Sequence, residues 1–281
     1  MSTLFVVATP IGNLDDMAPR AVATLRDVQL IAAEDTRQSA KLLRRFNIST
    51  PMLSYHQHNE RERAGRLIAA LAVGDVALIS DAGTPAVSDP GQKLVAAVLA
   101  AGHRVVPIPG PSALTAAVSA SGMVPGPFVF LGFLPRTGEE RRRMLAKAAA
   151  TGYPLVLFES PVRLGKTLRD LGAALGERTA LVARELTKLH EELSFGTLDT
   201  LADSYRDTEP RGEVVIVVGE QAAADEPEQD DIGGVVRRLL AEGLKPSRVA
   251  REAAAITGRP GSVVYDLVRE LVREREGDAR G

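Results

Sequence analysis

The first 110 residues alternate short apolar runs with stretches of helical periodicity, and this alternation constrains the fold more than any other feature. The runs are apolar on both faces, which is typical of a parallel sheet covered by helices on both sides. The pattern predicts strands at residues 4–9, 30–33, 75–80 and 104–108, and helices at 18–26, 61–72, 92–101 and 113–120. The N-terminal part is therefore expected to be an α/β domain.

A second alternating series begins near Pro127. It predicts strands at 128–133, 155–158, 180–184 and 213–218, helices at 139–150 and 161–175, and a polar alternating stretch from Glu192. A chain of 281 residues is long enough for two compact units. We therefore expect two α/β domains, residues 1–118 and 119–219.

The remaining residues divide into a linker and a small appendage. Residues 220–231 carry six acidic residues and no basic one, and this composition predicts a mobile linker. Beyond it the pattern predicts three short helices at 235–242, 246–257 and 262–275, with Gly243 and Gly258 ending the first two. This helical appendage, residues 232–281, loosely resembles a helix-turn-helix. Roles in RNA binding, dimerisation and solubility remain open for it.

Composition excludes several classes of protein. The chain has no Cys, so disulfides, thiolate nucleophiles and Cys-based metal sites are excluded, and no metal is expected. It begins without a basic signal-peptide region, and no apolar run reaches the ~18 residues that span a bilayer. We expect a cytoplasmic protein that does not associate with membranes. The net charge of −2 arises in the acidic linker, so an RNA partner is compatible with the charge but not required by it.

Three turns rich in Gly and Pro follow predicted strands, at 9–14, 80–91 and 108–113. Ligands of open α/β sheets bind at the carboxyl ends of the strands, where these turns lie. Gly83 would let a ligand approach the main chain, Asp89 and Pro90 are expected to begin the next helix, and Ser112 is expected to cap another. The turns match neither a dinucleotide fingerprint nor a Walker loop. The alternative, that they serve folding alone, remains open here.

Several segments, taken together and in order, resemble the tetrapyrrole-methylase superfamily. They are Thr9–Leu14, Glu34–Arg37, Ser54–Glu60, Ser80–Gly91, Ile108–Ala113, Gly132–Pro135, Phe158–Arg163, Arg184–Lys188 and Arg211–Glu213. Within the superfamily they resemble the group that methylates RNA of the small ribosomal subunit. The resemblance implies two α/β domains with S-adenosylmethionine in the cleft between them. It also implies a homodimer that methylates the ribose 2′-oxygen of a cytidine near the decoding centre of 16S rRNA, with 16S rRNA or the 30S subunit as partner.

The turns and the resemblance together indicate candidate residues for the functional site. The expected cofactor-binding residues are Pro10, Asp81, Gly83, Thr84, Val87, Ser112, Ala113 and Phe158. The candidate catalytic residues are Glu34, Arg37 and Lys188, with Asp35, Glu159 and Glu192 as further candidates for accepting a proton. The candidate RNA-binding residues are His56, His58, Arg141 and Arg163. For each charged residue, a structural ion pair or a solvated surface position is the alternative.

Two other functions remain open at this point. One is a methyltransferase that acts on a tetrapyrrole or another small molecule, as many members of the superfamily do. The other is a ribosome-binding module without catalytic activity. Binding of S-adenosylmethionine would separate this module from either enzyme.

Overall fold

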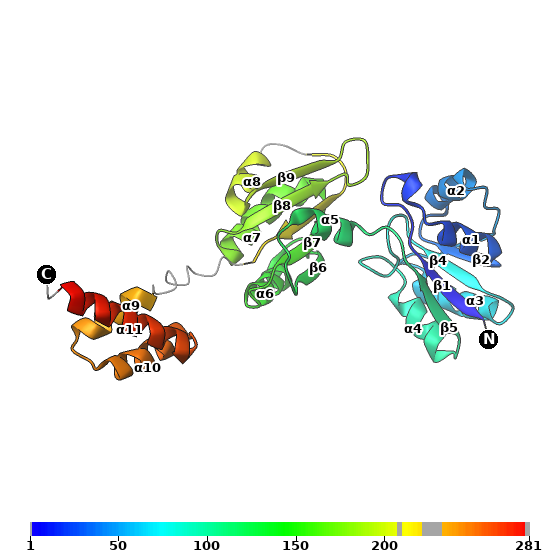
Figure 1. The fold of residues 1–281 in the computed structure, drawn as a ribbon. Coiled ribbons are helices and arrows are strands. Elements are labelled where there is room, and N and C mark those ends of the chain that lie inside the picture. The colour runs from blue at the N-terminus through cyan, green and yellow to red at the C-terminus, as the bar shows by residue number, and fades with distance from the viewer. Residues whose placement is uncertain (1, 207–209, 221–231, 279–281) are drawn as a thin grey trace. The chain divides into compact units, whose positions relative to one another are not determined.

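The computed structural model describes residues 2–206, 210–220 and 232–278, with side chains described as far as Arg273. The chain divides into two compact units, Met1–Gln221 and Ala222–Gly281. The first unit contains two five-stranded sheets, and the second is helical (Figure 1). The predicted linker, except Glu220, lies outside the described residues. The predicted division of the first unit near residue 118 stays a prediction.

The first sheet is entirely parallel, with the strand order β3-β2-β4-β1-β5. Its strands are β1 (Thr3–Val7), β2 (Leu30–Ala33), β3 (Met52–Ser54), β4 (Val76–Ile79) and β5 (Arg104–Ile108). The helices between them are α1 (Pro19–Asp27), α2 (Thr36–Arg45), α3 (Glu60–Leu71) and α4 (Gln92–Ala100). Neighbouring residues of β2, Ile31 and Ala32, belong to different apolar clusters. Both faces of the sheet are therefore buried, which explains the uninterrupted apolar runs.

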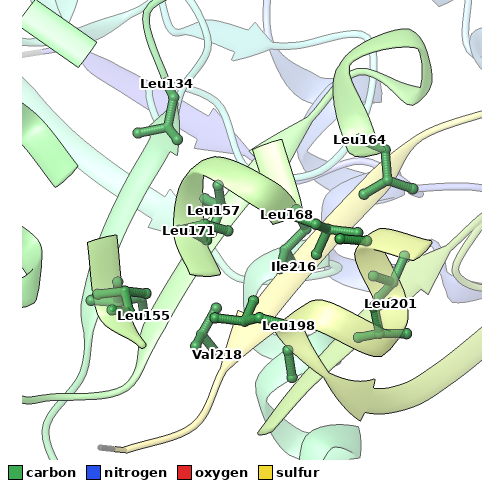
Figure 2. Packing of buried hydrophobic residues seen from close by; sticks show 14 of the residues in the cluster. Leu134, Leu155, Leu157, Leu164, Leu168, Leu171, Leu198, Leu201, Ile216 and Val218 are labelled. Atoms are coloured by element: carbon green, nitrogen blue, oxygen red, sulfur yellow. The ribbon is translucent and has the colours of Figure 1, made fainter. Parts of the chain in front are cut away.

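The second sheet is mixed, with the strand order β6-β7-β10-β8-β9 and only β6 and β7 parallel. Its strands are β6 (Val129–Phe133), β7 (Leu155–Glu159), β8 (Thr179–Arg184), β9 (Glu192–Thr197) and β10 (Val214–Val218). The helices around it are α5 (Ala113–Ser121), α6 (Gly138–Ala149), α7 (Leu164–Leu175) and α8 (Leu198–Ser204). Leucines of α7 and α8 pack on one face against strand residues such as Ile216 (Figure 2). Ala117 of α5 belongs to the apolar cluster on the other face.

The C-terminal unit contains α9 (Ile232–Ala241), α10 (Pro246–Thr257) and α11 (Gly261–Asp278). Its core includes Val236 from α9, Val249 from α10, and Val264 and Val268 from α11. Gly258 has a φ of +64° and ends α10, as the sequence predicts. The three helices thus enclose a small apolar core of their own.

Some local expectations were wrong or incomplete. The helix after the second turn begins at Gln92 with Gly91 as its N-cap, so Asp89 does not cap it. Ser112 precedes α5, but its side chain makes no capping hydrogen bond. Helices α2 and α8 and strand β3 have no counterpart among the predicted elements. No helix in the described part of the chain is long and apolar enough to cross a membrane.

Candidate active site

A pocket of about 430 Å³ lies where loops at the carboxyl ends of the first sheet meet the second sheet. Loops after β1, β2, β4 and β5 supply one part of its wall, and residues around β6, β7 and β10 supply the other. Parallel strands end at a common edge, so the chain order of these loops places them together. Its lining residues are Ile11, Glu34, Asp81–Thr84, Val87, Asp89, Ser112, Ala113, Phe133, Phe158–Pro161 and Gly212–Val215.

The loop 80–91 is tied to the first turn of the chain. The N–H of Thr9 donates to the carbonyl of Gly83 at 2.9 Å, and the N–H of Gly83 donates to the carbonyl of Thr9 at 3.0 Å. Gly83 has a φ of +74°, and a Cβ there would lie 3.3 Å from Ile11 Cγ2. The glycine is needed both for its backbone conformation and for the close packing of two walls of the pocket.

Glu60 fixes the far end of the same loop. Its buried carboxylate accepts hydrogen bonds from the N–H of Gly91 (3.3 Å) and the Tyr55 hydroxyl (3.4 Å), and it pairs with Lys93 at 2.9 Å. Burial acts to raise the pKa of Glu60, but Lys93 and the Gly91 N–H outweigh it and hold the pKa low. Gly91 has a φ of +142°, and a Cβ there would lie 2.8 Å from Leu78 Cδ2. The Tyr55–Glu60 segment thus holds the end of the 80–91 loop in place, through a contact that the local sequence pattern does not predict.

Three carboxyls of the pocket, Glu34, Asp81 and Asp89, form no ion pair within the described residues. Burial, and then repulsion by Asp81, raises the pKa of Glu34. Burial also raises the pKa of Asp81, although Asp35 N–H donates to its carboxylate at 3.0 Å. Burial and then Glu34 raise the pKa of Asp89 to about 6. This wall of uncompensated carboxyls favours a cationic ligand.

Two other carboxyls that line the pocket, Glu159 and Glu213, are bound by other groups of the protein. The Glu159 carboxylate accepts hydrogen bonds from Thr167 Oγ1 (2.6 Å), Ser160 N–H (2.7 Å) and Arg163 Nη2 (3.0 Å). The Glu213 carboxylate pairs with Lys188 at 3.2 Å. These contacts build the wall formed by β7 and β10, and they leave Glu159 unsuited to accept a proton from a substrate.

Seven of the eight predicted cofactor-binding residues line the pocket; they are Asp81, Gly83, Thr84, Val87, Ser112, Ala113 and Phe158. Pro10 is not among the lining residues, although its neighbour Ile11 is. The structure therefore brings together residues that lie up to 77 positions apart in the sequence, between Asp81 and Phe158. That these seven residues bind a cofactor remains a proposal.

The candidate catalytic residues lie in different places. Glu34 lines the pocket, whereas Arg37 and Lys188 do not. The Arg37 side chain is 88% exposed and pairs with Asp35 at 3.0 Å. Lys188 lies between Glu185 (2.8 Å) and Glu213 (3.2 Å). Burial opposes its charge, but the two carboxylates together raise the pKa of Lys188.

Asp35 and Glu192, also considered as proton acceptors, lie outside the pocket lining. The Asp35 carboxylate caps α2 through the N–H of Arg37, and the Arg37 side chain lowers the pKa of Asp35 to about 2. The Glu192 carboxylate pairs with Arg184, which lowers the pKa of Glu192. Carboxylates held ionised in this way are weak bases.

The four candidate RNA-binding residues do not line the pocket either. The rings of His56 and His58 lie 6.0 Å apart, on the loop before α3. Arg163 donates to Glu159 and to the carbonyl of Leu134.

The predicted role of Arg141 in RNA binding does not fit its position. This residue is only 4% exposed and donates to Asp170 (2.8 Å), Thr167 (2.9 Å) and the carbonyl of Pro135 (3.0 Å). Its guanidinium is used to join α6 to α7. The neighbouring Arg142 and Arg143 are exposed.

Comparisons with known proteins agree with this architecture. A family model described as Tetrapyrrole (Corrin/Porphyrin) Methylases matches residues 3–202. A protein from Synechocystis sp. called ribosomal RNA small subunit methyltransferase I is 46% identical over 275 residues, which cover 96% of this chain and 99% of that protein. A protein of the same name from Pseudomonas aeruginosa is 48% identical over 272 residues, with 94% and 95% covered.

Solved structures share the fold at low sequence identity. Uroporphyrin-III C-methyltransferase from Thermus thermophilus, complexed with S-adenyl homocysteine, has a TM-score of 0.58 and 19% identity, with 78% of this chain and 98% of that chain covered. A cobalt precorrin-4 methyltransferase has a TM-score of 0.61 and 17% identity, with 77% and 94% covered. The family match and the full-length relatives show that this chain belongs to the tetrapyrrole (corrin/porphyrin) methylase family, in the group of the proteins called ribosomal RNA small subunit methyltransferase I.

Proposed function

We propose that this protein transfers a methyl group from S-adenosylmethionine to RNA of the small ribosomal subunit, in the cytoplasm. The observation that carries the proposal is the 46–48% identity to the ribosomal RNA methyltransferases named above, because it extends over nearly the whole length of both chains. A non-catalytic module would have no need of the pocket and of the glycines that shape it.

The chemistry of the pocket fits S-adenosylmethionine. Apolar side chains, among them Ile11 and Phe158, offer a surface for the adenine ring. The carboxyls of Glu34, Asp81 and Asp89 match the positive charge of a sulfonium. Because the Ser112 side chain does not cap α5, the N–H groups of the first turn are available to the cofactor's carboxylate.

The reaction asks the protein chiefly to align two reactants. The cofactor supplies a methyl group on a positively charged sulfur, and the acceptor oxygen must face it in line. A ribose hydroxyl is a poor acid, so a carboxylate beside it assists by accepting its proton. Glu34, Asp81 and Asp89 are the pocket carboxyls best suited to this task, since all three have raised pKa values and no ion pair within the described residues.

We further propose that the acceptor is the 2′-oxygen of a cytidine near the decoding centre of 16S rRNA. The test is incorporation of labelled methyl groups into 30S particles that lack the modification, followed by mapping of the methylated nucleotide. Methylation of a base, or of another nucleotide, would contradict the finer proposal only. Cofactor binding without incorporation into any ribosomal substrate would contradict the broader one, and competition by a porphyrinogen would then favour a small-molecule acceptor.

We also propose that the protein is a homodimer. Strand β9 is an edge strand of the second sheet, and its Leu193 and Phe195 are exposed on the face where Ala183 and Leu181 are buried. Leu189, in the preceding loop, is 93% exposed. Apolar side chains gathered in this way on a surface are typical of a protein interface. Sedimentation equilibrium tests the proposal, and a monomer at micromolar concentration would contradict it.

A further inference from the structure

Helix α2 carries the largest excess of basic residues of any described helix. All four charged residues among its ten are basic, and Arg37, Lys41, Arg44 and Arg45 are all exposed. The opposite side of the helix buries Ser39 and Leu43. By contrast, α3 alternates its arginines with Glu60 and Glu62.

The four side chains follow one side of the helix. Lys41 follows Arg37 by four residues, and Arg44 and Arg45 follow Lys41 by three and four, so all four lie on one side of the helix. From Arg37 to Arg45 the helix rises ~12 Å, which matches the axial rise of about three to four nucleotides in one strand. The row therefore has the length and the charge to contact consecutive phosphates.

Two of the four cations, Lys41 and Arg44, have no carboxylate partner among the described residues. Arg37 pairs with Asp35, and Arg45 approaches Asp15 only at 4.0 Å. Lys41 and Arg44 form no ion pair with the described residues: Lys41 donates to the Gln38 amide oxygen (2.8 Å) and Arg44 to the carbonyl of its own helix at Ala40 (3.1 Å).

Helix stability explains only part of this arrangement. Like charges spaced four residues apart, as in the pairs 37/41 and 41/45, destabilise a helix. Arg44 and Arg45 in the last turn interact favourably with the helix dipole, whereas Arg37 in the first turn opposes it. A helix that only had to pack Leu43 against the core would be more stable with mixed charges.

The start of α2 lies beside the pocket. Glu34, which lines the pocket, is followed by Asp35, which caps α2. The N–H of Asp35 donates to the carboxylate of Asp81, another lining residue, at 3.0 Å. A strand held along α2 would therefore have one end at the pocket.

We propose that the exposed basic row of α2 binds the phosphate backbone of the substrate RNA and leads it to the pocket. This inference rests on the proposed function, and it replaces the catalytic role expected for Arg37 by a binding role. The acidic wall of the pocket and the basic row beside it then have separate tasks. The first holds a cation, and the second holds a polyanion.

The test compares three variants of the full-length protein. Lys41→Gln/Arg44→Gln removes two cations of the row, Arg61→Gln/Arg66→Gln removes two exposed arginines of α3 as the matched control, and Lys41→Arg/Arg44→Lys keeps the charge of the row. Binding of each to 16S rRNA fragments and to unmodified 30S particles is measured over a range of salt concentrations. Methyl incorporation and calorimetry with S-adenosylmethionine are measured in parallel.

We expect the α2 glutamine variant to bind RNA roughly tenfold more weakly at moderate salt. Its plot of log affinity against log salt concentration should be less steep by about 1.4 to 1.8, as for two lost phosphate contacts. Its affinity for S-adenosylmethionine should not change, and the charge-preserving variant should bind like the wild type. Equal RNA affinity and salt slope in the α2 and α3 glutamine variants would overturn the inference. Absence of methyl incorporation by a wild type that binds RNA would instead refute the proposed function.

Discussion

Replacement of Asp89 by Asn is expected to stabilise the protein while weakening cofactor binding. Asp89 lies in the wall of the pocket, where burial and then the Glu34 carboxylate disfavour its charge and raise its pKa from 3.8 to about 6. The rise corresponds to ~3 kcal/mol of unfavourable free energy in the folded state when the group is ionised. An amide of the same shape removes this cost.

The pH dependence follows from the direction of the shift. Well below pH 3.8 the carboxyl is protonated in both the folded and the unfolded state, so the wild type has no penalty. Between pH 3.8 and about 6 the unfolded state loses its proton first, and the penalty grows. Above pH 6 it is complete. The advantage of Asp89→Asn should therefore appear as the pH rises through this window and then stay constant.

Thermal unfolding from pH 4 to pH 8 measures the effect. Since solvent at the pocket reduces the cost, we expect a gain of about 1–3 kcal/mol at pH 8, equivalent to a rise in Tm of roughly 2–10 °C. Asp16→Asn, which changes an exposed carboxyl outside the pocket, serves as the control and should change Tm little. Calorimetry should show weaker binding of S-adenosylmethionine to Asp89→Asn. A gain that is equal at pH 4 and pH 8, or no gain at all, would refute the reasoning.

Three other substitutions test separate parts of the structure. Gly83→Val should abolish binding of S-adenosylmethionine in calorimetry while circular dichroism shows a folded protein, because a side chain at φ +74° meets Ile11; retained binding would remove this loop from the site. Glu159→Ala should lower the free energy of unfolding by about 3–5 kcal/mol in urea titrations, since it leaves buried donors unpaired, and a loss below 1 kcal/mol would contradict this. Leu193→Lys should shift the sedimentation equilibrium toward monomer if β9 is the dimer interface, and an unchanged dimer would exclude this surface.

The sequence predicts most strands of the two sheets, although not β3, because buried strands and amphipathic helices leave strong periodic patterns. It does not predict α2, whose ten residues include only two large apolar ones, Leu42 and Leu43. That helix depends on its Asp35 cap and on burial of Leu43 by distant parts of the chain. The sequence also does not predict the direction of the strands in the second sheet, since a strand buried on both faces has the same apolar pattern in either direction.

The pocket loops are predictable for a related reason. The Gly- and Pro-rich turns at 80–91 and 108–113 indicate irregular backbone after apolar runs, and the topology of a parallel sheet then brings these turns to one edge. No Gly- or Pro-rich turn or apolar run marks Glu60 as a residue that shapes the pocket. Its role arises from contacts with Gly91 and Lys93, about thirty residues away in the sequence, and those depend on the folded structure.

The same limit explains why the carboxyls could not be assigned from sequence. Glu60 and Glu159 are fully bonded within the protein, and they fix the shape of the loops that form the pocket. Glu34 and Asp89 line the same pocket and form no ion pair with the described residues, so they keep raised pKa values and destabilise the fold when ionised. A protein retains such a loss of folding free energy where binding of a ligand compensates for it. The division between carboxyls that build the site and carboxyls that serve a ligand is set by the partners each one meets after folding.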